Sequence, residues 1–421
     1  MQTQIAEPFK ESPMGAEAEA ILRKCVHCGF CLATCPTYKL TGDELDSPRG
    51  RIYLLKQLLE GNSVSAKTQF HLDRCLGCRA CETTCPASVP YHRLVELSIP
   101  LVEAEVPRSL KQRLLRRAIL SVLPYHQRFS PILNTARLVR PLLPKQLAKK
   151  IPPRQATHSQ SEALPESATR SMLILEGCVQ PSLSPEINQA TARVLGRLGI
   201  KLEAAPKAGC CGAVSYHLNQ QEDGLDFMRR NIDAWWPQIE RGCEAIVITA
   251  SGCGTTVKEY GELLKDDPAY AEKAKRVSAL AADLIEILSA EDLSALDIHP
   301  EQSLAFQCPC SLQHGQKLGG KVEALLRQLG FEMKPVRDSH ICCGSAGTYS
   351  IFQPELATEL RANKLQSLHD SGAQQYISAN IGCIMHLSQE TERPVRHWIQ
   401  IIDQALHSGP QGHKNKKRDS L

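Results

Sequence analysis

The chain has 421 residues, of which 42% are hydrophobic and 22% charged, so it is long enough for two or three domains with ordinary apolar cores. Its formal net charge of +4 gives no indication of nucleic-acid binding. Because no run of 18 apolar residues occurs and the polar start Met1–Ala20 lacks the layout of a signal peptide, we expect a cytoplasmic protein without a membrane-spanning helix.

The first quarter of the chain is predicted to be helical. We expect the first twenty residues to be poorly ordered, because they are polar and terminal. A short helix should run from Glu17 to the first cysteine. A second helix is predicted within Ser47–Glu60, where apolar residues follow helical spacing and Gly61 provides a stop signal. A third helix follows the last cysteine of this region, which gives a small helical domain over residues 1–105.

Two identical cysteine runs of the form C-x2-C-x2-C-x3-C-P dominate this helical domain. They are Cys25, Cys28, Cys31 and Cys35 before Pro36, and Cys75, Cys78, Cys81 and Cys85 before Pro86. Bacterial ferredoxins use this spacing to hold two [4Fe-4S] clusters, and the fourth cysteine of each run binds the other cluster. We therefore predict two cubane clusters, with the ligand sets Cys25, Cys28, Cys31, Cys85 and Cys75, Cys78, Cys81, Cys35. Zinc sites and disulfides are far less consistent with this doubled pattern in a reducing compartment.

Residues 106–170 form a basic segment and linker. Between Val106 and Ser161 there is no Asp or Glu, whereas twelve Lys and Arg residues fall in the same stretch. Apolar residues at helical spacing lie opposite the arginines, namely Leu110, Leu114, Leu115, Ile119 and Leu123. Two interpretations stay open: a basic amphipathic helix on an anionic membrane or an acidic partner, or a solvated helix that covers the neighbouring domain. Residues 151–169 are predicted to be a linker and residues 406–421 a basic tail.

From residue 171 onward, short apolar runs alternate with amphipathic segments, which is typical of parallel α/β folds. Strands are predicted at 172–176, 201–204 and 245–249, and helices at 186–198 and 219–239. The second half repeats this order, with strands at 303–306, 331–334 and 375–378, and helices at 320–329 and 354–368. The predicted fold class is therefore an all-helical, two-cluster ferredoxin-like domain followed by two duplicated α/β lobes with parallel sheets, residues 171–300 and 301–405.

The lobes also repeat their cysteines. Cys178, Cys210 and Cys211 correspond to Cys310, Cys342 and Cys343 at a shift of 132 residues, and Cys253 corresponds to Cys383 at a shift of 130. Each set falls at the carboxyl ends of strands, where ligands collect in open α/β sheets. We expect the cysteines of each lobe to converge on one metal or cofactor site; the alternative is that they are small apolar residues packed in a core.

This arrangement resembles the cysteine-rich CCG domain, through the motifs Cys210-Cys211-Gly212 and Cys342-Cys343-Gly344. The resemblance implies noncubane [4Fe-4S] clusters of the kind found in heterodisulfide reductase, where the domain closes with Cys-x-x-Cys. Here the closing positions hold Thr256 and His386, so each lobe lacks one thiol. His386 and Cys308 are the candidate replacements in the second lobe. An additional noncubane cluster or metal in the lobes is therefore an expectation.

The whole chain resembles the iron-sulfur subunits of glycolate oxidase. The shared features are the doubled cysteine run, Ser47-Pro-Arg-Gly-Arg51, the basic linker, and the motifs Cys342–Gly347 and Ala379–Cys383. The resemblance implies an electron-transfer subunit of a 2-hydroxy acid dehydrogenase that has no catalytic residues of its own. It would receive electrons from an FAD-binding catalytic subunit, assemble with a second flavoprotein-like subunit, and pass electrons to membrane quinone at the inner face of the cytoplasmic membrane.

Other hypotheses stay open at this point. The chain could be a heterodisulfide-reductase-like thiol/disulfide enzyme, or a non-catalytic scaffold whose lobe cysteines bind zinc or nothing. It could also be the iron-sulfur subunit of a D-lactate or glycerol-3-phosphate dehydrogenase, because such subunits share these domains. No nucleic-acid partner is expected.

Overall fold

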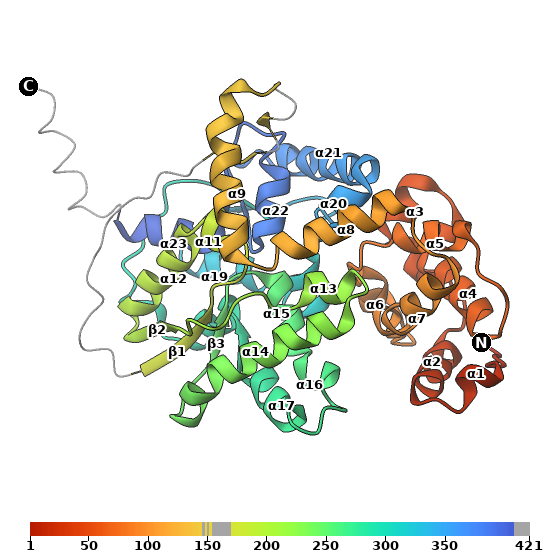
Figure 1. The fold of residues 1–421 in the computed structure, drawn as a ribbon. Coiled ribbons are helices and arrows are strands. Elements are labelled where there is room, and N and C mark those ends of the chain that lie inside the picture. The colour runs from red at the N-terminus through yellow and green to blue at the C-terminus, as the bar shows by residue number, and fades with distance from the viewer. Residues whose placement is uncertain (145–147, 150, 154–169, 408–421) are drawn as a thin grey trace, which may run out of the picture.

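The computed structural model describes residues 1–144, 148, 149, 151–153 and 170–407 (Figure 1). A helical domain lies at one side of the molecule, to the right in the figure, and the two α/β lobes lie beside it. The helices of this domain are α1 (Glu7–Lys10), α2 (Pro13–Lys24), α3 (Pro36–Thr41), α4 (Pro48–Leu59), α5 (Ala66–Asp73), α6 (Ala80–Thr84) and α7 (Tyr91–Glu105). The observed architecture confirms the predicted fold class.

Helix α4 begins at a serine cap that fixes the segment between the two cysteine runs. The Ser47 hydroxyl accepts a hydrogen bond from the Gly50 amide at 2.9 Å, and Pro48 occupies the first helical position. Glycine is required at position 50, because a Cβ there would lie 2.0 Å from the carbonyl oxygen of Glu44. The close approach lets the turn before α4 pack tightly against the helix.

The expectation that the first twenty residues are poorly ordered is wrong. They form α1 and most of α2, and the side chain of Ile5 is buried in the core of the helical domain. The amide of Ala6 donates to the carbonyl oxygen of Leu59 at 2.9 Å, which fastens the start of the chain to the end of α4. Ser12 followed by Pro13 is a helix-start signal that could have predicted α2.

A buried carboxylate joins the two halves of the helical domain. Asp46 is fully buried, and its Oδ1 accepts hydrogen bonds from His71 at 2.9 Å and from Arg51 at 3.5 Å, while Oδ2 accepts one from Arg74 at 2.7 Å. Burial opposes the charge, but the hydrogen bonds from His71 and Arg74 outweigh it and hold the pKa of Asp46 below its ordinary value. The network links α4 to α5 and to the residue that leads into the second cysteine run.

The basic segment forms two helices, α8 (Leu110–Val122) and α9 (His126–Val139), which lie across the upper side of the molecule in Figure 1. Only Ile119 of α8 and Leu133 of α9 are buried. The leucines that the sequence placed opposite the arginines are largely exposed, with Leu110 at 69% and Leu114 at 55%. Most of the predicted linker and almost all of the basic tail lie outside the described residues.

The first lobe is a parallel sheet of strands β1 (Arg170–Leu175), β2 (Ile200–Ala204), β3 (Ile246–Ile248) and β4 (Ala281–Asp283), in the order β2-β1-β3-β4. Its longer helices are α12 (Glu186–Arg197), α14 (Gln221–Glu240), α15 (Ser251–Lys258), α17 (Ala271–Leu280) and α18 (Leu284–Ala290). Short helices α11 (Gln180–Leu183), α13 (Ala213–His217) and α16 (Tyr260–Leu263) complete it.

The second lobe repeats this topology with strands β5 (Leu304–Gln307), β6 (Met333–Lys334), β7 (Gln375–Ser378) and β8 (Val395–His397), in the order β6-β5-β7-β8. Its helices are α19 (Lys321–Gln328), α20 (Tyr349–Phe352), α21 (Pro354–Asp370), α22 (Ile381–Leu387) and α23 (Trp398–His407), with a π-helical turn η5 (Ser311–Gly315). The sequence analysis missed β4 and β8, because each is three residues long and runs directly into a helix.

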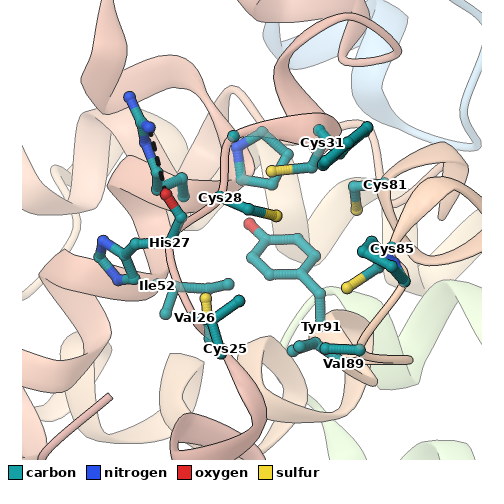
Figure 2. A pocket seen from close by; sticks show the side chains of 16 residues that line it. Cys25, Val26, His27, Cys28, Cys31, Ile52, Cys81, Cys85, Val89 and Tyr91 are labelled. Carbon is teal, nitrogen blue, oxygen red and sulfur yellow. Dashed lines mark hydrogen bonds between the residues drawn. The ribbon is translucent and has the colours of Figure 1, made fainter.

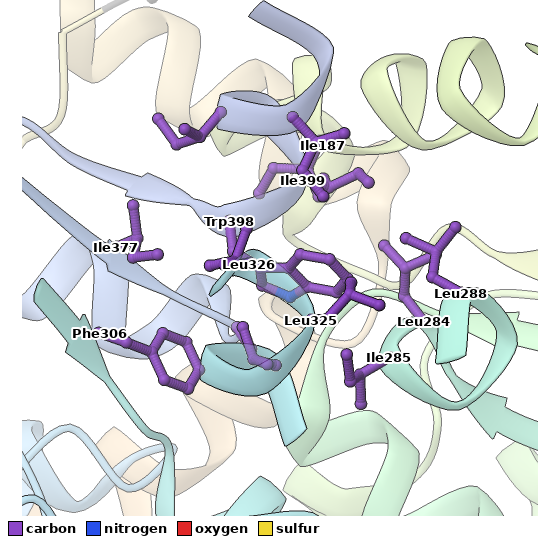
Figure 3. Close-up of a cluster of buried hydrophobic side chains, with 14 of the residues drawn as sticks. Ile187, Leu284, Ile285, Leu288, Phe306, Leu325, Leu326, Ile377, Trp398 and Ile399 are labelled. Atoms are coloured by element: carbon purple, nitrogen blue, oxygen red, sulfur yellow. The ribbon is translucent and has the colours of Figure 1, made fainter. Parts of the chain in front are cut away.

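The two lobes share one apolar core. Ile187 of α12 packs with Trp398 and Ile399 of α23, and α18 contributes Leu284 to the same cluster (Figure 3). Trp398 and Leu284 are fully buried, so the core is continuous across the lobe boundary. Burial of a large side chain of this kind stabilises the folded state by about 1.5–3 kcal/mol. The lobes are therefore packed as one unit.

Polar contacts also cross the lobe boundary. His397 donates from Nε2 to the carbonyl oxygen of Thr249 at 2.9 Å, and Gln316 donates to Oδ2 of Asp283 at 3.1 Å. Burial raises the pKa of Asp283 to about 7, and the hydrogen bonds from Ile285 and Gln316 only partly oppose this. The helix cap at the start of α18 thus contains a carboxyl group that titrates near neutral pH. None of the helices in the described ranges is both long and apolar enough to cross a bilayer.

Replacing Asp46 by Asn should destabilise the protein by about 3–5 kcal/mol, because the substitution leaves the buried Arg51 guanidinium without its anion. Urea unfolding of the anaerobically purified protein measures the effect. The control is Asp43→Asn, since Asp43 is exposed and caps the neighbouring turn. A shift no larger than that of the control would contradict the structural role given to Asp46.

The contribution of Asp283 to stability should fall as the pH rises from about 5 to 7, because folded Asp283 binds a proton with a pKa of about 7 while the unfolded carboxyl has a pKa of about 3.9. The folded state therefore binds more protons over this range and loses that advantage as they dissociate. Between about pH 5 and 7, urea midpoints should rise more, or fall less, with pH in Asp283→Asn than in Asp292→Asn, which alters an exposed cap. Equal slopes in the two variants would rule out this source of pH dependence.

Candidate iron-sulfur centres

The first cysteine pocket lies between the first run and the end of α6. Cys25, Cys28, Cys31 and Cys85 line it, and the ring of Tyr91 lies among these side chains (Figure 2). Cys85 comes from the second run and follows α6 directly. The four thiols that the sequence assigns to one cubane cluster therefore surround one pocket, with Cys81 at its edge.

The second pocket collects the other predicted set. Cys75, Cys78 and Cys81 come from the second run, and Cys35 comes from the end of the first. Cys81, Tyr91 and Pro48 line both pockets, so the two sites share part of their walls. Centres held in the two pockets would be close neighbours.

Each cysteine run turns through residues with left-handed backbone. His27 and Gly29 have φ values of 56° and 84°, and the matching positions Gly77 and Arg79 have φ values of 61° and 60°. This conformation is uncommon for residues other than glycine and carries a cost of order 1–3 kcal/mol. The repeated turn directs successive cysteines of each run into the same pocket.

The amino-terminal end of α4 lies between the pockets. Pro48 lines both, Arg49 lines the first pocket and Arg51 lines the second. Arg51 is 1% exposed; burial opposes its charge, but the neighbouring thiolate of Cys75 acts to raise the pKa of the guanidinium. A buried cation at this position would offset part of the negative charge of thiolate ligands in the pocket.

Hydrogen-bond donors point at the sulfurs of the second pocket. The Gly77 amide lies 3.4 Å from the Cys75 sulfur and the Tyr91 hydroxyl lies 3.7 Å from it. The Thr37 hydroxyl lies 3.3 Å from the sulfur of Cys35. Donors of this kind stabilise thiolate ligands and tune the reduction potential of an iron-sulfur cluster. The surroundings of the pocket therefore fit a thiolate-bound redox centre.

The first lobe brings its four cysteines into a row. Cys178, Cys210, Cys211 and Cys253 follow one another through hydrogen-bonded thiols at the carboxyl ends of β1, β2 and β3. Hydrogen bonds to Cys178 and Cys211 raise the pKa of Cys210, whereas Cys210 and Cys253 hold the pKa of Cys211 well below its ordinary value.

The second lobe forms the matching row of Cys310, Cys342, Cys343 and Cys383. The sulfurs of Cys310 and Cys342 are 3.9 Å apart. The Gly344 amide donates to Cys342 at 3.4 Å, and the Asn380 side chain donates to Cys383 at 3.6 Å. The predicted convergence of each lobe's cysteines is therefore present in the structure.

Two further candidates are placed differently. His386 is buried, and its Nε2 donates to the carbonyl oxygen of Ala357 at 3.2 Å; burial lowers the pKa of the imidazole to about 4. Cys308 is buried in the shared apolar core. Their roles as replacement ligands stay predictions. Cys243, which the sequence analysis did not single out, donates to the carbonyl oxygen of Ala245 at 3.1 Å and lies outside both rows.

Close groups of metal-binding side chains are few in the described ranges. Tetrahedral zinc with Zn–S bonds of about 2.3 Å places its sulfurs about 3.8 Å apart. Within the described ranges, no three cysteine sulfurs all lie within 4.8 Å of one another. The one close triad of metal-binding residue types there is Asp43, Asp46 and His71, and Asp46 is already paired with arginines.

The structure adds residues that sequence reasoning did not assign. These residues are Tyr91 between the pockets, Arg49 and Arg51 beside them, and the groups that donate hydrogen bonds to sulfur. No regular spacing in the sequence marks any of them as part of the site. The motif Ser47–Arg51 was the one feature of the sequence that could have indicated the two arginines, because it places both at the start of a predicted helix.

Comparisons with known proteins agree with this picture. A 4Fe-4S dicluster domain matches residues 21–89, and a cysteine-rich domain matches residues 172–258 and 304–388. A crystal structure of a hypothetical protein from Helicobacter pylori aligns over 95% of this chain and 73% of that chain with a TM-score of 0.53 at 12% identity, which shows likeness of fold alone. Fold and site together define an iron-sulfur electron-transfer protein with a two-cluster domain and duplicated cysteine-rich lobes.

Similarity to individual proteins identifies the family of iron-sulfur proteins to which the chain belongs. The glycolate oxidase iron-sulfur subunit of Escherichia coli is 54% identical over 96% of this chain and 99% of that protein. The probable glycolate oxidase iron-sulfur subunit of Bacillus subtilis is 29% identical over 93% of each chain, and lactate utilization protein A of Bacillus licheniformis is 28% identical over 54% of this chain. The chain belongs to the family of glycolate oxidase iron-sulfur subunits. It is an electron-transfer subunit of an oxidoreductase and carries iron-sulfur clusters.

Cys85→Ser should perturb the same cluster as Cys28→Ser, because Cys85 lines the first pocket although it belongs to the second run. The spectroscopic change should differ from that of Cys78→Ser, and each variant should lose up to about four irons per chain. Cys243→Ser, which lies outside every pocket and row described above, should retain the iron of the unmodified protein. If Cys85→Ser resembled Cys78→Ser instead, the exchange of fourth ligands would be wrong.

Proposed function

We propose that the chain relays single electrons through two [4Fe-4S] clusters, one held by Cys25, Cys28, Cys31 and Cys85 and the other by Cys75, Cys78, Cys81 and Cys35. The observation that carries this proposal is the pair of cysteine-lined pockets that share Cys81, Tyr91 and Pro48, each lined by one of the two predicted ligand sets. Clusters bound there would supply one-electron redox chemistry. The protein's own groups would hold the ligands, limit water access and offset the thiolate charge through Arg51.

The proposed donor is an FAD-binding partner subunit that oxidises glycolate or a similar 2-hydroxy acid, and a second flavoprotein-like subunit completes the complex. The flavin takes two electrons from the acid and releases them one at a time. The proposed acceptor is a membrane quinone, which takes two electrons and two protons. No proton needs to pass through the chain described here. The names of the Escherichia coli and Bacillus subtilis relatives support glycolate over other 2-hydroxy acids.

We further propose that the cysteine rows of the lobes ligate an additional iron-sulfur centre. Four thiols at the carboxyl ends of parallel strands form a ligand set in each lobe, and the rows recur at matching places in the repeat. Backbone and side-chain donors to Cys342 and Cys383 support thiolate character in the second row. Anaerobically isolated protein with substantially more than about eight irons per chain would carry such a centre.

The surface of α8 and α9 supports peripheral attachment to the inner face of an anionic membrane. Exposed apolar side chains at Leu110, Leu114 and Ile132 are accompanied by the exposed cations Arg113 and Arg117. Exposed leucines beside cations are typical of helices that lie in a lipid interface. Arg116 is a structural residue instead, because it contacts Glu103 at 3.7 Å.

Cys81→Ser should abolish electron flow from the 2-hydroxy acid to quinone in the assembled complex, because Cys81 lines both pockets. Reduction of an artificial acceptor directly by the flavin subunit should be unchanged. Cys243→Ser serves as the matched control for a buried cysteine and should retain quinone reduction. Quinone reduction that survives in Cys81→Ser would overturn the relay role.

Replacing Arg113 and Arg117 by Gln should reduce binding of the complex to phosphatidylglycerol vesicles at low salt, because two cations of about 1 kcal/mol each are lost from the proposed contact surface. Sedimentation with vesicles measures the bound fraction. Lys207→Gln with Arg241→Gln removes the same charge from exposed positions of the first lobe and should leave binding unchanged. Equal retention of both double variants would mean that α8 is a solvated helix.

A further inference from the structure

The second lobe packs directly against the second cysteine run. Leu76, which follows Cys75 in the second run, is buried in a small cluster with Cys342 and Tyr349. Cys78 and Cys310 pack against the same cluster. A ligand of the second pocket and the first two thiols of the second-lobe row therefore meet in one apolar contact. Burial and the nearby Cys310 raise the pKa of Cys78, in agreement with this proximity.

Tyr349 provides a second link between the same two sites. Its hydroxyl donates to the carbonyl oxygen of Arg74 at 3.2 Å, immediately before Cys75. Burial raises the pKa of Tyr349, and the thiolates of Cys75 and Cys342 act in the same direction. The phenol therefore lies between a ligand of the second pocket and a thiol of the second-lobe row.

The contact is fixed by a histidine from the second lobe. The Thr83 hydroxyl lies 2.8 Å from Nδ1 of His314, and Nε2 of His314 lies 3.0 Å from the carbonyl oxygen of His340. Burial lowers the pKa of His314, so the neutral ring donates from Nε2 and accepts at Nδ1. This pair docks α6 onto the turn that follows Cys310.

The first lobe reaches the helical domain in a different way. Arg79 forms an ion pair with Glu259, and His217 lines the edge of the second pocket. These are polar contacts, and the first-lobe side chain that lines the pocket is an imidazole rather than a thiol. Thiols of the second-lobe row therefore pack with the second cysteine run, whereas the first-lobe row approaches the second pocket through His217, which lies near Cys211, although the lobes repeat each other in sequence and topology.

The rows also differ in one buried residue beside them, although Arg230 of the first lobe also donates to the carbonyl oxygen of Cys210 at 3.5 Å. Gly212 lies against the carbonyl oxygen of Gly224 in α14, and Gly344 lies against that of Ala357 in α21. Because the two contacts are equivalent, α14 and α21 can be aligned at a shift of 133 residues. Under this alignment Lys364 of the second lobe corresponds to Asn231 of the first.

Both of these side chains are buried next to their cysteine motifs. Lys364 is 3% exposed and donates to the carbonyl oxygen of Asp338 at 2.7 Å, on the loop that leads to Cys342. Asn231 donates to the carbonyl oxygen of Cys210 at 2.8 Å. A buried ammonium favours a more negative, reduced state of a neighbouring centre, and a neutral amide lacks this effect.

We infer that the second lobe, and not the first, continues the electron path from the second pocket, across the contact of Cys78 and Tyr349 with Cys310 and Cys342, and that Lys364 favours the reduced state of the second-lobe site. This inference rests on the proposed function, in which both sites hold iron-sulfur centres. Each transfer oxidises the second-pocket site and reduces the second-lobe site by one electron. The reduced flavin of the partner subunit is the source of that electron.

The first test compares Cys310→Ser with its repeat equivalent Cys178→Ser in the anaerobically purified full-length chain. Iron content and low-temperature electron paramagnetic resonance of the reduced protein are measured together. Both variants should lose lobe iron. Only Cys310→Ser should change the linewidth and relaxation of the second-pocket signal, because only that variant removes a neighbouring paramagnetic centre.

The outcomes separate the inference from the proposed function. Loss of lobe iron in both variants, with the second-pocket signal unchanged in Cys310→Ser or equally changed in Cys178→Ser, would overturn the path through the second lobe. Iron that is unchanged in both variants would show that the lobes hold no cluster, and both proposals for the lobes would then fail.

The second test addresses Lys364. Lys364→Gln should lower the midpoint potential of one iron-sulfur signal at constant iron content, because a positive charge that stabilises the reduced state is removed. Lys364→Arg keeps the charge and should stay near the potential of the unmodified protein. Lys321→Gln changes an exposed lysine of the same lobe and should have no effect. An unshifted potential in Lys364→Gln, or the same drop in Lys364→Arg, would contradict the role of the charge.

Discussion

The arrangement of the redox sites depends on the buried ion pair between Asp46 and Arg51. Asp46 alone would be an uncompensated charge in the core, and so would Arg51, whose guanidinium lies beside the second cysteine pocket. Arg51 also donates hydrogen bonds to the Thr37 hydroxyl at 3.1 Å and to the His71 carbonyl oxygen at 2.8 Å. Thr37 follows the first cysteine run and His71 precedes the second, so the Asp46–Arg51 pair holds these two segments in place relative to each other. Two runs from separate parts of the sequence can then exchange their fourth cysteines.

Shared side chains also connect the sites outward from the helical domain. Tyr91 separates the two pockets and donates to a sulfur of one of them, while Leu76 and Tyr349 connect the second pocket to a lobe. The two pockets and the second-lobe row therefore form a series in which neighbouring sites share or contact the same side chains. The rate of electron transfer falls steeply with distance, so sites whose lining side chains are shared are well placed for a relay. The duplicated lobes keep one topology and one shared core, yet they differ in the buried residue beside the cysteines, Lys364 in one and Asn231 in the other.

Local spacing made much of the architecture predictable. The doubled cysteine run specified the helical domain, and the alternation of apolar runs with amphipathic helices specified the two parallel sheets. Strands β4 and β8 were not predicted, because a strand of three residues is too short to show a periodic pattern of apolar residues. The ordered structure of the first twenty residues was not predicted, because it depends on tertiary contacts such as the hydrogen bond between Ala6 and Leu59. Arg51 and Lys364 could not be assigned to their sites, since burial beside thiols is a property of packing rather than of spacing.

The most direct test of the central claim is the electron paramagnetic resonance spectrum of the anaerobically purified, dithionite-reduced protein in which the lobe cysteines Cys178 and Cys310 are both replaced by serine. The two clusters of the helical domain should then remain, and because their pockets share Cys81 and Tyr91, the spectrum should integrate to about two unpaired electrons per chain and show the broadening of interacting spins. A spectrum of isolated, non-interacting centres, or a protein that contains zinc in place of iron, would contradict the account.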